Sequence, residues 1–278
     1  MVESKDRSIL LIGESNAGKT HYGAQFLRRL IVGDNALTMD GAASNLRPFS
    51  AALDCLAEGR STEHTPATTY VESIWPLKDR SGHKAQLVWP DYAGEQVLNL
   101  VKQRKVPTAW RDRVMLASDW VLLLRLHSVR AADDLFSRPL DELGKPSPER
   151  KPYEPSDQAR TIELLQILLY VAGVALDRAC VCPGLTVLLS CWDELNTDEA
   201  PSAVLIKRLP MLAAFIESNW VTPTVMGLSA LEKPLSTKET DTAYATQGPE
   251  SFGYVILPDG TRSNDITRPI QHMLAAAN

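Results

Sequence analysis

The sequence predicts an α/β fold, with a central, mostly parallel β-sheet and helices on both of its faces. Short apolar runs of strand length alternate with longer segments in which apolar residues recur at helical spacing. Several of these runs are apolar throughout, as is typical of parallel strands buried on both faces. Since no internal repeat or domain boundary interrupts this order, we expect one domain over residues 1–278.

The individual elements follow from the same patterns, because uninterrupted apolar runs favour strands and helical spacing favours helices. The expected strands are 8–13, 69–77, 84–89, 120–126, 185–190 and 222–228. The expected helices are 18–32, 49–57, 95–105, 157–178, 201–218 and 266–277. A polar, broken segment occupies 33–64, and loop-rich insertions are expected at about 129–157 and 231–264. The first insertion is rich in proline and charge, so it buries too little apolar surface to offset its ordering entropy.

The composition excludes several classes of protein. A net charge of −5 leaves no overall basic footprint for nucleic acid, so none is expected as a partner. The longest apolar stretch, Leu164–Leu176, is too short to cross a bilayer, and no membrane span is expected. The N-terminus has no apolar core, so no signal peptide is expected there. The four cysteines lack the spacing of a zinc site, and we expect reduced thiols in a cytoplasmic protein.

The first strand leads directly into a phosphate-binding P-loop, the pattern G-x-x-x-x-G-K-T. Its residues are Gly13, Glu14, Ser15, Asn16, Ala17, Gly18, Lys19 and Thr20. The glycines let successive backbone N–H groups point at phosphate oxygens, and the helix that follows adds the positive end of its dipole. In such a loop Lys19 reaches the β- and γ-phosphates of a nucleotide, and the Thr20 hydroxyl is a ligand for Mg²⁺.

An acidic residue follows the expected strand 84–89. Asp91 opens the pattern D-x-x-G, which closes at Gly94. A carboxylate at the end of a neighbouring strand is what a P-loop protein needs to hold Mg²⁺. The Gly94 N–H is expected to meet the γ-phosphate.

Two further motifs suit recognition of a guanine base. Ser190-Cys191-Trp192-Asp193 follows one apolar strand, and Ser229-Ala230 follows the next. The Asp193 carboxylate can accept two hydrogen bonds from the N1 and N2 edge of guanine, a pair that adenine cannot donate. Backbone N–H groups at Ser229 and Ala230 are expected to bind the guanine O6.

These motifs, in this order, resemble those of Ras-like P-loop GTPases of the TRAFAC class. The long segment 33–64 and the C-terminal run Phe252–Ile270 make the chain most similar to the bacterial double-GTPase group. The resemblance implies a switch that uses GTP, GDP and Mg²⁺. It also implies a protein partner such as a second GTPase, in a bacterial conflict system. The threonine of switch I, a ligand of Mg²⁺ in this family, corresponds to Thr65, with Thr68 as the alternative.

Two departures from the resemblance bear on the expected chemistry. Cys191 stands where Ras-like proteins have a lysine that lies along the base, and Glu95 stands where they have a catalytic glutamine. Glutamine orients the attacking water as donor and acceptor, whereas ionised glutamate only accepts. We therefore expect slow hydrolysis that needs help in trans. Arg60, upstream of Thr65, is a candidate for an arginine that stabilises the transition state in cis.

Two other functions remain open from the sequence. Cys191 permits an ATP-using P-loop enzyme, either an ATPase or a kinase. Glu95 permits a module that binds nucleotide without hydrolysing it. Two further residues lie near the motifs: His21 is expected on the surface of the first helix, and Trp192 is a candidate to cover the base.

Overall fold

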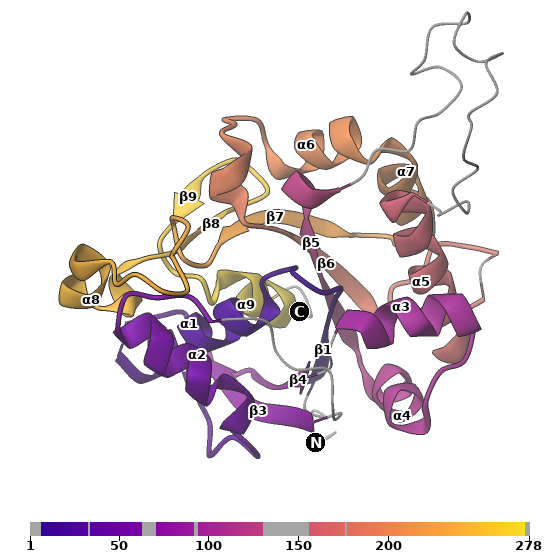
Figure 1. Cartoon of the computed structure of the whole chain (residues 1–278). Coiled ribbons are helices and arrows are strands. Elements are labelled where there is room, and N and C mark those ends of the chain that lie inside the picture. The colour runs from indigo at the N-terminus through magenta and orange to yellow at the C-terminus, as the bar shows by residue number, and fades with distance from the viewer. Residues whose placement is uncertain are drawn as a thin grey trace, which may run out of the picture.

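The strands form one continuous sheet in the structure, a computed structural model that describes residues 7–32, 34–62, 71–91, 94–129, 156–175 and 177–275 (Figure 1). The order across the sheet is β2-β3-β4-β1-β5-β6-β7-β8-β9. The strands are β1 (Arg7–Gly13), β2 (Leu37–Met39), β3 (Val71–Asp79), β4 (Lys84–Asp91), β5 (Asp119–Arg125), β6 (Gly184–Ser190), β7 (Thr224–Ser229), β8 (Tyr254–Ile256) and β9 (Arg262–Ser263).

The centre of the sheet is parallel, and both of its flanks are antiparallel. β1 pairs in parallel with β4 and β5, and β6 pairs in parallel with β5 and β7. β2 and β3 extend one flank in antiparallel pairing, and β8 and β9 extend the other. The expected parallel centre is therefore confirmed, and the carboxyl ends of its strands meet at one edge, where open α/β sheets bind their ligands.

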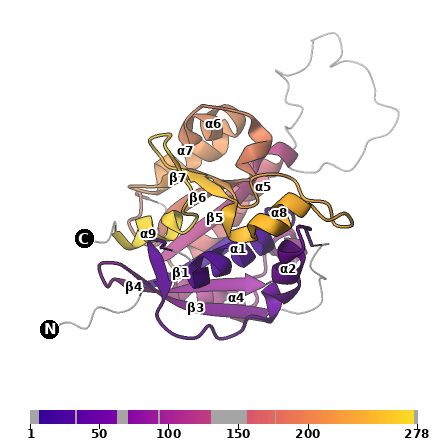
Figure 2. The same cartoon turned by 90° about the vertical axis from the view of Figure 1, so that its left-hand side faces the viewer.

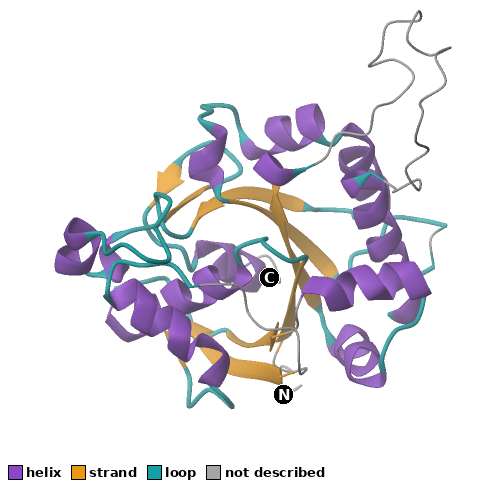
Figure 3. Ribbon diagram, viewed as in Figure 1, coloured by secondary structure: helices purple, strands orange, loops and turns teal. Residues whose placement is uncertain are grey.

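Helices cover both faces of the sheet (Figure 3). They are α1 (Lys19–Val32), α2 (Arg47–Ala57), α3 (Gly94–Gln103), α4 (Thr108–Leu116), α5 (Asp157–Val171), α6 (Pro201–Arg208), α7 (Pro210–Asn219), α8 (Thr242–Gln247) and α9 (Arg268–Ala275). The side that carries α1, α2, α8 and α9 faces the viewer in Figure 2. Among the helices that the structure describes, none is long and apolar enough to cross a membrane.

Alternate residues of β1 enter two separate cores. Ile9 and Leu11 pack with apolar residues of α1, α2 and α9, whereas Leu10 and Ile12 pack with residues of α3, α4, α5, α6 and α7. Side chains of a strand alternate between the two faces of its sheet, so a run apolar at every position needs cover on both sides. The uninterrupted apolar runs of the sequence therefore correspond to strands with a core on each face.

A close approach of α1 to α2 tightens the first of these cores, the one that contains Ile9 and Leu11. A Cβ at Gly23 of α1 would lie 2.2 Å from Cε1 of Phe49, so this position has no room for a side chain. Phe49 meets Trp75 and Trp89 edge-on, and the two tryptophans stack with their ring centroids 5.0 Å apart. The aromatic cluster joins α1, α2, β3 and β4.

Several expected boundaries were wrong, each for a local reason. The helix expected over 157–178 ends at Val171, just before Gly173 at φ 72°. The helix expected over 201–218 is two helices, because Pro210 begins α7 and cannot continue α6. Within the loop-rich insertion expected at 231–264, the structure has α8 and the two short strands β8 and β9, which extend the sheet. β2 and α4 were not expected from the sequence.

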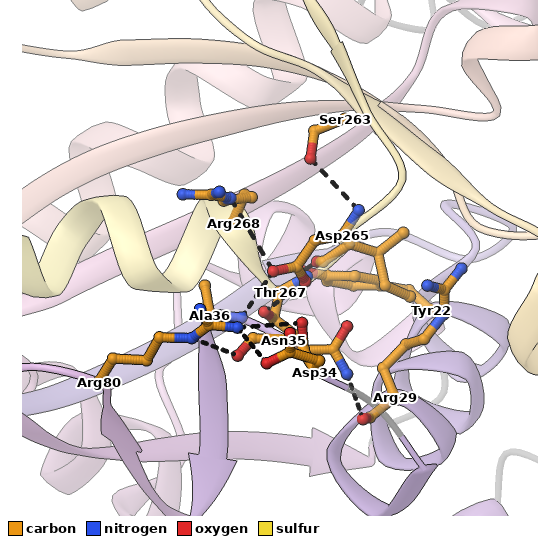
Figure 4. A network of polar contacts seen from close by, with 11 residues as sticks. Tyr22, Arg29, Asp34, Asn35, Ala36, Arg80, Ser263, Asp265, Thr267 and Arg268 are labelled. Atoms are coloured by element: carbon orange, nitrogen blue, oxygen red, sulfur yellow. Dashed lines mark hydrogen bonds and ion pairs between the residues drawn. The ribbon is translucent and has the colours of Figure 1, made fainter.

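Asp265 joins the C-terminal helix to the connection between α1 and β2 (Figure 4). One carboxylate oxygen accepts hydrogen bonds from the N–H and the hydroxyl of Thr267, at 2.9 and 2.6 Å, beside the start of α9. The other accepts from the N–H of Ala36 at 2.7 Å. Arg80 donates to the Asp34 carboxylate and to the carbonyl of Asn35 in the same connection. The network holds the end of α1 against α9.

We expect D265A to lower the free energy of unfolding by about 2–3 kcal/mol, because it removes a turn at a helix start and leaves the Ala36 N–H without its acceptor. Denaturant unfolding followed by circular dichroism measures this change. D259A is the control, since Asp259 makes a similar pair of bonds to Thr261 at an exposed turn. Equal losses for the two variants would contradict the assigned role of Asp265.

Candidate functional site

The P-loop connects β1 to α1 as its sequence predicts. β1 ends at Gly13, α1 begins at Lys19, and the loop between them turns through left-handed conformations at Asn16 (φ 64°) and Gly18 (φ 78°). Gly13 packs closely on β5, where an added Cβ would lie 3.2 Å from Cβ of Leu123. The loop therefore presents its backbone at the carboxyl edge of the sheet, next to the first turn of α1.

Lys19 lies over its own loop. Its ammonium group donates hydrogen bonds of 2.7 Å to the carbonyl oxygens of Gly13 and of Glu14. The Nζ charge is thereby held at the mouth of the loop, where a phosphate would meet it. Thr20 follows in the first turn of α1.

A bidentate ion pair anchors the P-loop to α5. The Arg160 guanidinium donates to both carboxylate oxygens of Glu14, at 2.7 Å each, and pairs with Asp157 at 2.7 Å. The Glu14 side chain is 25% exposed and that of Arg160 is 16% exposed, so the pair is largely removed from water. Hydrogen bonding to Glu14 raises the pKa of Arg160, which stays charged. The negative charge of Glu14 is thus neutralised beside the phosphate-binding backbone.

The two motifs assigned to base recognition meet in space. The Ser229 hydroxyl, at the end of β7, donates to the Asp193 carboxylate in the loop that follows β6. The same hydroxyl accepts from the N–H of Glu232 at 3.0 Å. β6 and β7 are parallel neighbours, which is why motifs far apart in the sequence lie together. Asp193 is held in one orientation, and Ala230 follows directly after Ser229.

The loop after β6 also contacts the P-loop. Cys191 adopts a left-handed conformation, with φ 52°, and its Sγ lies 3.9 Å from where a Cβ of Gly18 would be. Burial raises the pKa of the Cys191 thiol to about 11, so it carries no charge at neutral pH. Trp192 is buried in the core against Gly227, which leaves that ring unable to cover a base.

Three further side chains of this region were missed or misplaced from the sequence. Arg125, the last residue of β5, forms a bidentate ion pair with Glu194. Its Nε donates a hydrogen bond of 3.0 Å to one carboxylate oxygen of Glu194, and a terminal nitrogen donates to the other. His21 is partly buried rather than on the surface, and its Nε2 lies 3.3 Å from the N–H of Thr62. Arg160 and Arg125 belong to no local motif, and their bidentate partners Glu14 and Glu194 lie 146 and 69 positions away in the chain. No sequence pattern signals such long-range pairs.

The structure describes only some of the remaining predicted site residues. Thr65 and Thr68 lie outside the described residues. β4 ends at Asp91 and α3 begins at Gly94, but the side chains of Asp91 and Glu95 lie outside the described part of the chain. Arg60 pairs with Glu58 and donates to the carbonyl of Thr237 at 3.4 Å. Its role in hydrolysis stays a prediction.

Comparison with known proteins identifies a family. The family model described as Double-GTPase 1 matches residues 10–273, nearly the whole chain. The chain is similar in structure to the Arl6 small GTPase of Trypanosoma brucei, with 9% identity over 89% of this chain and 96% of that one, at a TM-score of 0.39.

A second similar structure is the signal recognition particle receptor complex SRb-GTP/SRX of Chaetomium thermophilum. It shares 15% identity over 84% of this chain and 95% of that one, at a TM-score of 0.40. No curated protein matches this sequence. The family assignment therefore rests on the family model.

The Glu14–Arg160 pair should contribute measurably to stability. In a double-mutant cycle with E14A, R160A and the double variant, we expect a coupling free energy of about 1–3 kcal/mol, because the pair is bidentate and largely buried. The control is the exposed ion pair of Arg104 with Glu163, an acid that also lies on α5. For this pair we expect a coupling free energy of less than about 0.5 kcal/mol. Equal coupling energies in the two cycles would contradict the inferred anchoring.

Proposed function

Because the chain belongs to the Double-GTPase 1 family, we propose that it is a switch that binds GTP with Mg²⁺, hydrolyses it slowly and signals to a protein partner. The observation that carries this proposal is the hydrogen bond between Ser229 and Asp193. This hydrogen bond brings both base-recognition motifs together beside a P-loop. Such an arrangement favours a guanine-nucleotide site over unrelated roles for the two motifs.

The phosphates are assigned to the P-loop. The backbone N–H groups of residues 14–18 and the start of α1 supply donors and the positive end of a helix dipole. Lys19 would exchange its bonds to the loop carbonyls for bonds to the β- and γ-phosphates. The ion pair with Arg160 keeps the Glu14 carboxylate from repelling the phosphates.

Mg²⁺ is assigned to oxygen donors at the same edge. Thr20 lies in the first turn of α1, and Asp91 ends β4, the parallel neighbour of β1. A hydroxyl and a carboxylate are hard oxygen ligands of the kind that Mg²⁺ prefers, so the residue types fit the ion. The bound ion would neutralise charge on the phosphates. Thr65, or alternatively Thr68, completes the set in this proposal.

The base is assigned to Asp193 with Ser229 and Ala230. The carboxylate accepts from guanine N1–H and N2–H, and Ser229 restrains its rotation. An adenine ring offers no such pair of donors, so its binding would leave the carboxylate without partners. Backbone N–H groups at Ser229 and Ala230 would donate to the guanine O6.

Slow hydrolysis is assigned to Glu95. An ionised carboxylate adds negative charge near the γ-phosphate and cannot donate to the attacking water. Lys19 stabilises the charge that develops on the phosphates, and Arg60 is proposed to assist it. The segments around Thr65 and Gly94 would order with GTP and relax after hydrolysis, which changes the surface offered to a partner.

The setting of the switch is also a proposal. The resemblance to bacterial double GTPases favours a second GTPase as partner, in a conflict system of the bacterial cytoplasm. The four free cysteines of the structure agree with a reducing compartment.

Base selection is testable by D193N. We expect affinity for GDP to fall by at least about 100-fold, because the amide cannot accept both guanine protons. Affinity for xanthosine diphosphate should rise, since an asparagine donates to the xanthine O2 and accepts from N1–H. Isothermal titration calorimetry measures both changes. D198N, an exposed acid of the same loop, is the control, and unchanged guanine binding by D193N would contradict the assignment.

The proposed cause of slow hydrolysis is testable by E95Q. We expect the single-turnover rate of GTP hydrolysis to rise by about 10-fold or more, since glutamine both donates and accepts and carries no charge. E95A removes the charge but supplies no amide, so it separates the two causes. A rate for E95Q at or below that of the wild type would show that Glu95 does not limit hydrolysis.

A further inference from the structure

A tryptophan directly before Asp193 is buried against a strand position that has no side chain. Trp192 is 4% exposed and opens the short helical turn Trp192–Leu195, which follows β6. A Cβ added at Gly227 of β7 would lie 2.6 Å from both Cδ2 and Cε3 of the indole ring, which is closer than packed atoms approach. The function proposed above uses Asp193 but assigns no role to Trp192.

The indole ring lies in a gap that the register of the sheet creates. Leu189 of β6 and Ile256 of β8 are the partners of Gly227 on its two sides. Leu189, Ile256 and Trp192 all pack in the core beneath α5, α6 and α7. The residues before and after Gly227 along β7 pack in the core on the other face of the sheet. Trp192 therefore occupies the place where a side chain of Gly227 would stand.

The same face of β7 carries the partner of Asp193. Ser229 is two residues beyond Gly227, so both positions point to one side of the sheet, about 7 Å apart. Trp192 meets the first position, and Asp193, next in the chain, accepts a hydrogen bond from the second. These two adjacent contacts dock the turn on β7.

The turn itself is compact. The N–H of Glu194 donates to the carbonyl of Cys191 at 3.0 Å. Left-handed residues bound the turn on both sides, with φ 52° at Cys191 and φ 46° at Asn196. A displacement of the Trp192 ring from β7 would therefore shift the carboxylate of Asp193 as well.

We propose that Trp192 and Gly227 are positioning residues for guanine recognition, because the seat of the indole ring on β7 sets where the Asp193 carboxylate lies. This inference rests on the function proposed above and deepens it. The ring acts through Asp193 and does not itself touch the nucleotide. Guanine affinity then depends on the fit of Trp192 against Gly227, whereas a ligand that does not use Asp193 is unaffected by that fit.

The first test is G227A in calorimetric titrations with GDP and with ADP, each with Mg²⁺. The added methyl group overfills the gap and displaces the ring. GDP affinity should fall by about 10-fold, the order of one hydrogen bond to a charged group. ADP lacks the paired donors of guanine, so its affinity should stay within about twofold. Equal losses for the two ligands, or unchanged binding of GDP, would overturn the proposal.

G184A is the matched control. A Cβ at Gly184 would also meet an atom at 2.6 Å, Oδ1 of Asp119, but Gly184 begins β6 at the opposite edge of the sheet. The variant therefore introduces a clash of similar size away from the base loop. We expect it to bind GDP within about twofold of the wild type. A loss as large as that of G227A would show that overpacking alone weakens binding, which would overturn the proposal.

Rescue by a smaller ring separates positioning from general damage. W192F alone leaves a gap over Gly227, and we expect its GDP affinity to fall by about fivefold. In the double variant G227A/W192F the methyl group refills this gap, so GDP should bind within about twofold of the wild type. A double variant that binds GDP no better than G227A would overturn the proposal.

W192F also provides the test if G227A does not fold, since wild-type affinity for GDP in W192F would contradict a positioning role. Failure of this inference is distinct from failure of the proposed function. A wild-type chain that binds GDP no more tightly than ADP overturns both. A wild-type preference for GDP that G227A and W192F retain in full overturns this inference alone.

Discussion

Parallel pairing of β1, β5, β6 and β7 is the constraint from which the candidate site follows. It places the carboxyl ends of these strands at one edge, so that loops far apart in the sequence become neighbours. Without that register, the P-loop would be an isolated glycine-rich turn. With it, Ser229 reaches Asp193, and Cys191 reaches Gly18.

Ion pairs neutralise acidic side chains at this edge of the sheet. Two of its loop acids, Glu14 and Glu194, are each held by a bidentate arginine from a neighbouring element, Arg160 and Arg125. Neutralisation of these acids matters because a nucleotide brings several negative charges to the same place. The same pairs tie the loops to α5 and β5, so the positions of the phosphate and base loops depend on both elements.

The sequence was most informative where chemistry is local. The P-loop, the Ser190–Asp193 motif and the apolar strands are read from adjacent residues, and the family model confirms the class that they indicate. Prediction failed where the information is not local. β8 and β9 are too short to show a periodic pattern. The Glu14–Arg160 pair joins residues 146 positions apart, and only the folded sheet brings them together.

We propose that the loops after β6 and β7 select guanine. Calorimetric titration of the nucleotide-stripped protein with GDP and with ADP, each with Mg²⁺, tests it most directly. We expect GDP to bind at least about 10-fold more tightly than ADP, a difference of about 1.4 kcal/mol. Equal affinities, or tighter binding of ADP, would contradict it, because the Asp193–Ser229 contact would then serve the fold and not the base.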